Sequence, residues 1–226
     1  MTAPRMPELL APAGDIESFH TALLYGADAI YVGAEQFTMR VSSKNFSAAQ
    51  LISATAAAHR QRKKVYVTCN TFPRSEDLEQ LDGFLEGVLA AKADAVIVAD
   101  IGLLRWIRTQ APDLPIHVST QAGVVNHLTA QAFFELGAKR VVLARELSLE
   151  EIAEIRAKTD PRLELECFVH GAMCMSVSGR CLISQYLAGR DANRGHCAQP
   201  CRWSYRLVGE GDPGEFYSVE EEEQGP

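Results

Sequence analysis

Seven short, mostly apolar runs recur along this chain, and their repetition limits its possible folds more than any other feature. Three of them begin with a Gly-Ala or Lys-Ala pair: GADAIYVGAE from Gly26, KADAVIVAD from Lys92 and GAKRVVLARE from Gly137. The other four are ELLAPAG from Glu8, KVYVTCNT from Lys64, PIHVSTQAG from Pro115 and LELECFVHG from Leu163. Runs that are β-branched and apolar on both faces are typical of parallel strands covered by helices.

Helix signals separate these runs. IESFHTALLYG follows Asp15, a suitable N-cap, and Ser148 and Glu151 form a capping box at the start of SLEEIAEIRAK. Strands that alternate with helices predict an α/β fold, either a doubly wound sheet or a (βα)8 TIM-like barrel. No G-x-G-x-x-G follows a strand, which disfavours a dinucleotide-binding doubly wound sheet, so we favour the barrel.

The predicted barrel is incomplete, because only about seven strands are found. We expect the barrel in residues 1–170, a cysteine-rich segment in 171–206 and an acidic, flexible tail in 207–226. A barrel that lacks its eighth strand leaves two strand edges unpaired. We therefore expect the chain to be a fragment of a longer protein, or its closing strand to come from a segment outside this sequence.

Four cysteines form the most distinctive cluster in the sequence: Cys174, Cys181, Cys197 and Cys201, spaced C-x6-C-x15-C-x3-C. The N-terminus does not read as a signal peptide and no apolar run is long enough to span a membrane, so we expect a cytoplasmic protein with reduced thiols rather than disulfides. Structural zinc usually uses paired knuckles, and only Cys197 and Cys201 fit that spacing. An iron–sulfur cluster tolerates irregular spacing, so it is the favoured of the three interpretations.

The charge distribution leaves nucleic acid open as a partner. The net charge is −7, but residues 209–226 hold seven acidic and no basic side chains, so the rest of the chain carries 22 of each. The cysteine-rich segment contains five arginines up to Arg206 and a single acid, Asp191. These arginines either offset the charge of a cluster or bind phosphate and carboxylate groups. The basic run at 59–64 is either a phosphate contact or a solvated helix end.

Chemistry in a TIM-like barrel belongs at the carboxyl ends of its strands. Polar residues that follow the predicted strands include Asn70, Gln121, Arg145, Glu146, Glu166 and His170. They converge on the place where the cysteine-rich segment begins. The competing interpretation of each one is that it only satisfies backbone groups at a strand end.

The stretch ECFVHGAMCMSVSGRCLIS, from Glu166 to Ser184, resembles the signature of the U32 peptidase-like family, also called collagenase-like peptidases. The family pattern is E-x-F-x-x-G-[SA]-x-C-x4-G-x-C-x-[LIVM]-S, and every fixed position matches. ELLAPAG, GADAIYVG, HVSTQA, LARELSLEEI and GRDANRGHCAQPCRWSY extend the resemblance from Pro7 to about Tyr205. Within the family, the chain looks most like the bacterial branch that hydroxylates tRNA.

That resemblance implies a prephenate-dependent hydroxylation of the tRNA wobble uridine to 5-hydroxyuridine. It also implies a 4Fe-4S cluster on Cys174, Cys181, Cys197 and Cys201. The expected partners are tRNA and a small dicarboxylate, with no membrane. We assign catalytic roles to Glu166, His170 and Arg145, and substrate-binding roles to Arg40, Asn70, Gln121 and Arg180.

The residue types suggest particular tasks. The planar guanidinium groups suit a carboxylate or an RNA phosphate, and the amides suit a base or an acid. His170 either moves protons and orients a ligand, or packs as an outer-shell residue. Glu166 is either a general base or the partner of one of the arginines.

Two other functions remain open. One is proteolysis, as the family name says, with the thiol of Cys69 or Cys167 as the nucleophile. The sequence contains neither the G-x-S-x-G motif of serine hydrolases nor the H-E-x-x-H motif of zinc proteases. A buried cysteine, however, is usually just a small apolar residue. The other is a non-catalytic RNA-binding scaffold in which the cluster is structural.

Overall fold

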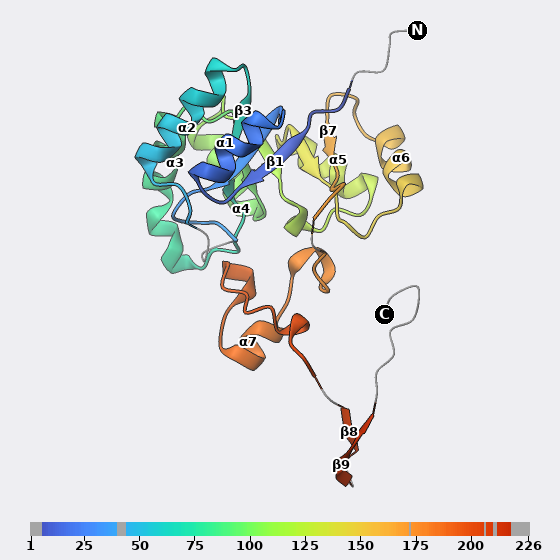
Figure 1. Cartoon of the computed structure of the whole chain (residues 1–226). Coiled ribbons are helices and arrows are strands. Elements are labelled where there is room, and N and C mark those ends of the chain that lie inside the picture. The colour runs from blue at the N-terminus through green and yellow to red at the C-terminus, as the bar shows by residue number, and fades with distance from the viewer. Residues whose placement is uncertain (1–5, 40–43, 172, 206, 210–211, 218–226) are drawn as a thin grey trace.

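The computed structural model describes residues 6–39, 44–171, 173–205, 207–209 and 212–217. Its largest part is a seven-stranded, all-parallel sheet in which each strand pairs with the next along the chain. The strands are β1 (Leu10–Ala13), β2 (Ala29–Gly33), β3 (Lys64–Cys69), β4 (Ala95–Val98), β5 (Ile116–Val118), β6 (Arg140–Val142) and β7 (Glu164–Glu166). The sheet curls into a half-barrel with helices on its outer side (Figure 1). All seven predicted strands and the α/β TIM-like fold are confirmed.

Helices connect successive strands. The barrel helices are α1 (Ile16–Leu24), α2 (Ala48–Arg60), α3 (Leu81–Ala90), α4 (Ile101–Gln110), α5 (His127–Glu135) and α6 (Leu149–Lys158). The predicted N-caps are present: the Asp15 carboxylate accepts from the backbone N–H of Ser18, and Ser148 forms a reciprocal capping box with Glu151. Such caps satisfy backbone donors that the first helical turn leaves free. Within the described residues, every helix is too short or too polar to cross a bilayer.

Apolar packing occurs on both faces of the sheet. Outward-facing valines and isoleucines of the strands join helix residues such as Phe19, Leu104 and Ile107 in the main core. A smaller inner cluster contains Ala29, Tyr66, Ala95 and Ile97. Strands buried on both faces read as continuous apolar runs, which is why the periodicity identified them.

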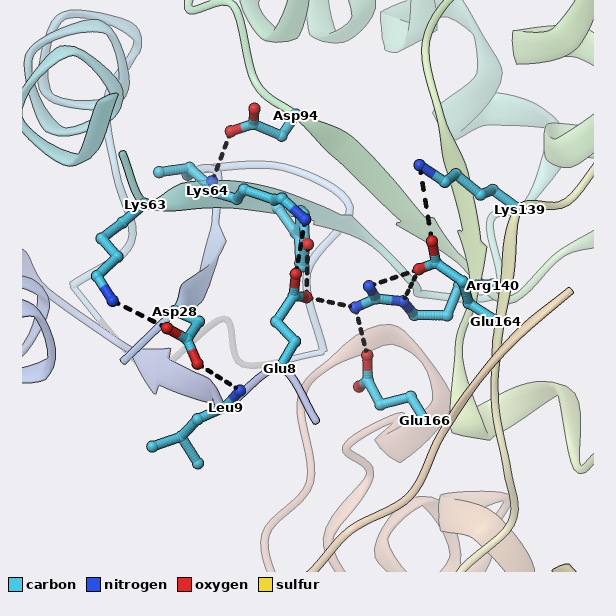
Figure 2. Close-up of polar contacts among 12 residues, drawn as sticks. Glu8, Leu9, Asp28, Lys63, Lys64, Asp94, Lys139, Arg140, Glu164 and Glu166 are labelled. Atoms are coloured by element: carbon cyan, nitrogen blue, oxygen red, sulfur yellow. Dashed lines mark hydrogen bonds and ion pairs between the residues drawn. The ribbon is translucent and has the colours of Figure 1, made fainter. Parts of the chain in front are cut away.

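A polar network joins the two ends of the sheet near β1 and β7 (Figure 2). Arg140, on β6, donates to carboxylate oxygens of Glu8 at 2.9 Å, Glu164 at 2.6 Å and Glu166 at 3.1 Å. Glu8 also accepts from Lys64 Nζ and from the Tyr66 hydroxyl, both at 2.7 Å. Glu8 lies just before β1, so these bonds connect the first strand of the sheet to β6 and β7. Among the described residues, no further strand joins the sheet between β7 and β1.

The chain leaves the sheet after β7 and forms the cysteine-rich segment from short helices (Figure 1). These are η3 (Val177–Gly179), α7 (Ile183–Ala188), η4 (Ala192–Arg194) and η5 (Pro200–Arg202). Beyond them, β8 (Leu207–Gly209) and β9 (Asp212–Tyr217) pair antiparallel. Part of the acidic tail is therefore a hairpin, which its charge pattern did not predict.

Candidate active site between the strand ends and the cysteine-rich segment

Glu146, just after β6, anchors the cysteine-rich segment to the barrel. Its carboxylate accepts from the backbone N–H of Ser178 at 2.7 Å and from the Ser178 hydroxyl at 3.0 Å. Ser178 is buried and has a φ of 48°, in the left-handed region that few non-glycine residues adopt. Burial raises the pKa of Glu146, but the Ser178 bonds outweigh it and hold the pKa below its usual value. The carboxylate thus fixes a turn between the first two cysteines.

Three of the predicted substrate-binding residues lie together at the carboxyl ends of the strands. The Asn70 amide donates to the side-chain oxygen of Gln121 at 3.2 Å. Arg180 Nε donates to the backbone carbonyl of Gln121 at 2.8 Å, and its guanidinium lies 5.3 Å from the centre of the Phe72 ring. A second bond joins Arg180 Nη2 to the carbonyl of Ala122 at 3.1 Å. The arginine is thereby held in one orientation over the strand ends.

Arg145 lies beside Cys174, the first cysteine of the motif. Its guanidinium is 5.9 Å from the centre of the Phe168 ring, and the Ser176 hydroxyl is 3.0 Å from the Cys174 sulfur. Burial raises the pKa of Cys174, but bonds from Ser176 and the charge of Arg145 outweigh it, so the pKa of this thiol falls below its usual value. The surroundings of Cys174 therefore favour a thiolate, the form that binds metal.

The other motif cysteines are held by their backbone and by donors to sulfur. Asn193 accepts from the N–H of Cys181 at 3.2 Å and donates to its carbonyl at 3.1 Å. Backbone N–H groups point at two sulfurs, from Ile183 to Cys181 at 3.4 Å and from Gln199 to Cys197 at 3.3 Å. Hydrogen bonds to sulfur are among the features that tune iron–sulfur clusters.

Thiolate sulfur, the donor that these cysteines offer, binds both zinc and iron–sulfur clusters. Within the described part of the chain all six cysteines are free thiols. No group of three His, Cys, Asp or Glu side chains among these residues is close enough to hold one metal ion.

The remaining predicted residues are placed differently. Glu166 bonds Arg140 rather than Arg145 or Arg180, and burial raises the pKa of its carboxyl group. His170 is exposed. Arg40 lies outside the described residues.

Sequence reasoning gave no role to three residues that shape this site: Phe72, Glu146 and Asn193. Glu146 had a signal, because it follows a predicted strand. Asn193 had a weaker one, because it lies within the GRDANRGHC stretch that carries the family resemblance. Phe72 had none, since its role depends on Arg180, which lies more than a hundred residues further along the chain.

Comparison with known proteins places the chain among relatives of two kinds. It is 44% identical over 207 residues to the tRNA hydroxylation protein P of Haemophilus influenzae, covering 92% of this chain and 45% of that protein. It is 45% identical over 217 residues to an uncharacterized protease of Methanocaldococcus jannaschii, covering 95% of this chain and 53% of that protein. The chain thus spans about half the length of these curated relatives.

The fold has a solved counterpart. The structure of a U32 peptidase matches with a TM-score of 0.61 at 20% identity, over 74% of this chain and 70% of that one. The family model described as peptidase family U32 matches residues 14–226. With this match over nearly the whole chain, and a signature that contains the first two motif cysteines, the chain belongs to peptidase family U32.

Proposed function

We propose that the protein containing this chain hydroxylates RNA, and specifically converts the wobble uridine of tRNA to 5-hydroxyuridine in a prephenate-dependent reaction. The single observation that carries the proposal is a segment with four free cysteines that Glu146 and Arg180 hold at the strand ends, in which three of the sulfurs have a hydrogen-bond partner. The name of the Haemophilus relative supports the same class of reaction.

In this proposal Cys174, Cys181, Cys197 and Cys201 hold a 4Fe-4S cluster. When bound, such a cluster supplies a redox centre whose potential depends on the hydrogen bonds to its sulfurs. Asn193 and Glu146 position the ligand-bearing turns through the bonds described above. Arg145 offsets the negative charge of the thiolates, because it lies beside Cys174.

The proposed site for the dicarboxylate lies at Arg180. A guanidinium group carries five N–H donors, and the backbone carbonyls of Gln121 and Ala122 take two of those of Arg180. The remaining donors suit one carboxylate of the co-substrate, in the paired geometry that arginine favours. Asn70 and Gln121 lie close enough to orient the same molecule, once they release their mutual bond.

The test is nucleoside analysis of tRNA from cells whose own enzyme is deleted and replaced by variants of the whole protein. We expect Cys174→Ala to abolish 5-hydroxyuridine and the matched variant Cys167→Ala, an exposed cysteine outside the motif, to retain it. Normal 5-hydroxyuridine in the Cys174→Ala strain would refute the role given to the cluster. Tight tRNA binding by the wild type without any product would support the scaffold alternative instead.

Proteolysis is the second candidate, favoured by the name of the Methanocaldococcus relative. The thiol environments speak against it. Cys69 is fully buried, and burial raises the pKa of its thiol well above the usual value. Cys167 is exposed, and among the described residues no hydrogen bond pairs it with an imidazole, as a cysteine protease requires. Gelatin cleavage that Cys167→Ala abolishes and Cys174→Ala spares would establish proteolysis.

A further inference from the structure

The cysteine-rich segment exposes several large apolar side chains, three of which are aromatic. Tyr186 on α7 is 87% exposed, Tyr205 is 61% exposed and Trp203 is 47% exposed. Large side chains of this kind are normally buried, and a group of them at the surface marks an interaction site. We call these three residues the aromatic face.

The aromatic face belongs to two elements that are joined to each other. The Ser184 hydroxyl on α7 accepts from the backbone N–H of Ala198 at 2.9 Å, which holds α7 against the turn leading into η5. Trp203 follows η5 directly, and the Tyr205 hydroxyl donates to the carbonyl of Pro200 at 2.8 Å. The three rings therefore stand on a braced piece of backbone rather than on a loose end.

Two arginines of the same segment lack a carboxylate partner among the described residues. Arg190 bonds the backbone carbonyl of His196 at 3.0 Å, and Arg202 bonds that of Met173 at 3.3 Å. Neither makes an ion pair with a carboxylate of the described residues, whereas Arg194 pairs with Asp77 at 2.6 Å. Asp191, the one acid between residues 167 and 205, pairs with Arg74 on the barrel side at 3.2 Å.

Exposed rings together with unpaired arginines match the chemistry of single-stranded nucleic acid. Aromatic side chains stack on unpaired bases, and arginine binds the phosphates between them. Two arginines without a carboxylate partner favour a ligand that carries phosphate, since burying such charges against an apolar surface is costly. In a double helix the bases are already stacked on one another, so they cannot stack on the aromatic side chains.

We propose that the aromatic face is a docking surface for an unpaired RNA loop, with bases stacked on Tyr186, Trp203 and Tyr205 and phosphates held by Arg190 and Arg202. The inference rests on the proposed function, because it names an unpaired loop as the part of the RNA substrate that this protein binds. It adds that the cysteine-rich segment recognises RNA as well as holding the cluster.

The experiment measures the affinity of the whole protein for a fluorescent tRNA anticodon stem–loop and for a fully paired duplex of the same length. We expect Tyr186→Ala or Trp203→Ala to weaken stem–loop binding about 5- to 160-fold, the range for loss of one stacked base. Trp203→Phe keeps a ring and is expected to restore most of the affinity. Tyr25→Ala is the matched control, because Tyr25 is 81% exposed at the end of α1 on the barrel.

The contribution of Arg190 and Arg202 is measured by the salt dependence of RNA binding. Each phosphate contact on a single strand contributes about 0.7 to the slope of log K against log salt. The double variant Arg190→Ala and Arg202→Ala is therefore expected to reduce that slope by about 1.4 between roughly 50 and 200 mM salt. Arg105→Ala is the control, since Arg105 is exposed on α4.

Three results would overturn the proposal. One is equal stem–loop binding by Tyr186→Ala and Tyr25→Ala, and another is equal affinity of the wild type for the stem–loop and the duplex. The third is protection of Tyr186 from nitration in the whole protein without RNA, which would mean that another part of the protein covers the face. Failure of the proposed function looks different: the wild type would then bind the stem–loop while cells lacking the protein kept normal 5-hydroxyuridine.

Discussion

Replacing Glu8 by glutamine tests how the two ends of the open sheet are held together. Glu8 accepts hydrogen bonds from Lys64, Tyr66 and Arg140 (Figure 2). Burial raises the pKa of Glu8, but these bonds outweigh it and lower the pKa from 4.5 to about 2. Glutamine keeps the size of the side chain and removes its negative charge.

The size of the effect follows from this shift. The fall of the Glu8 pKa from 4.5 to about 2 corresponds to about 3.4 kcal/mol. The Glu8 side chain is 22% exposed, and solvent screening reduces the figure, so we expect Glu8→Gln to cost about 2 to 3 kcal/mol of unfolding free energy at pH 7. With a urea slope of about 2 kcal/mol per molar, the midpoint falls by about 1 to 1.5 M.

The pH dependence separates this account from a simple packing defect. A carboxyl group whose folded pKa is depressed stabilises the protein above its unfolded pKa of about 4.5, and that contribution is lost as the pH falls toward 2. The difference between wild type and Glu8→Gln is therefore expected to shrink steadily below pH 4.5. Urea unfolding followed by circular dichroism at pH 7 and pH 3.5 measures it.

A matched control is Glu154→Gln, which removes an exposed carboxylate paired with Lys158 on α6. Exposed pairs contribute little, so its midpoint should stay near that of the wild type. A difference between wild type and Glu8→Gln that stays the same from pH 7 to pH 3.5 would refute the electrostatic reasoning.

Three further predictions concern other parts of the molecule. Burial and the charge of Arg140 lower the pKa of His117 from 6.5 to about 3, so below pH 6.5 the unfolded chain binds a proton that the folded chain does not. The wild type should therefore lose about 2 to 3 kcal/mol of unfolding free energy through this group between pH 7 and 4.5. Urea unfolding should show that His117→Phe does not have this part of the pH dependence. In Gly33→Ala the new Cβ would lie 2.7 Å from the Thr38 hydroxyl, so thermal unfolding should show a loss of about 1 to 3 kcal/mol of unfolding free energy. Gly83→Ala on α3 is the control, because open space surrounds that position, and it should be neutral or stabilising. Asn193→Ala removes both hydrogen bonds to the backbone of Cys181, so trypsin should cut the cysteine-rich segment about 5- to 100-fold faster. Gln185→Ala is the control, and equal cleavage rates of the two variants would contradict the positioning role of Asn193.

Local patterns predicted the elements of this fold well. Apolar runs identified the strands best in the middle of the sheet, where β4 and β5 are buried on both faces, whereas β1 and β7 at its ends are only partly buried. The caps at Asp15 and Ser148 were predictable because each bond joins residues three positions apart. The grouping of Asn70 and Gln121 followed from the rule that parallel strands end on one side of a barrel.

Contacts between distant residues could not be predicted in this way. Arg140 and Glu8 are 132 positions apart, and their ion pair exists only because the sheet curls until β6 approaches the start of β1. Glu166 was expected to be a general base or the partner of an arginine of the site, and it bonds Arg140, which the sequence did not single out. An arginine within the apolar run GAKRVV was the available signal, since a buried charge in a strand requires partners.

The most direct test of the central claim is the metal content of the anaerobically purified protein. The account predicts about four irons and matching sulfide per chain, with a broad visible absorption band from charge transfer between sulfur and iron. It also predicts that Cys201→Ala loses the iron while Cys167→Ala keeps it. One zinc per chain, or full iron content in Cys201→Ala, would contradict the assignment of the four cysteines to a cluster.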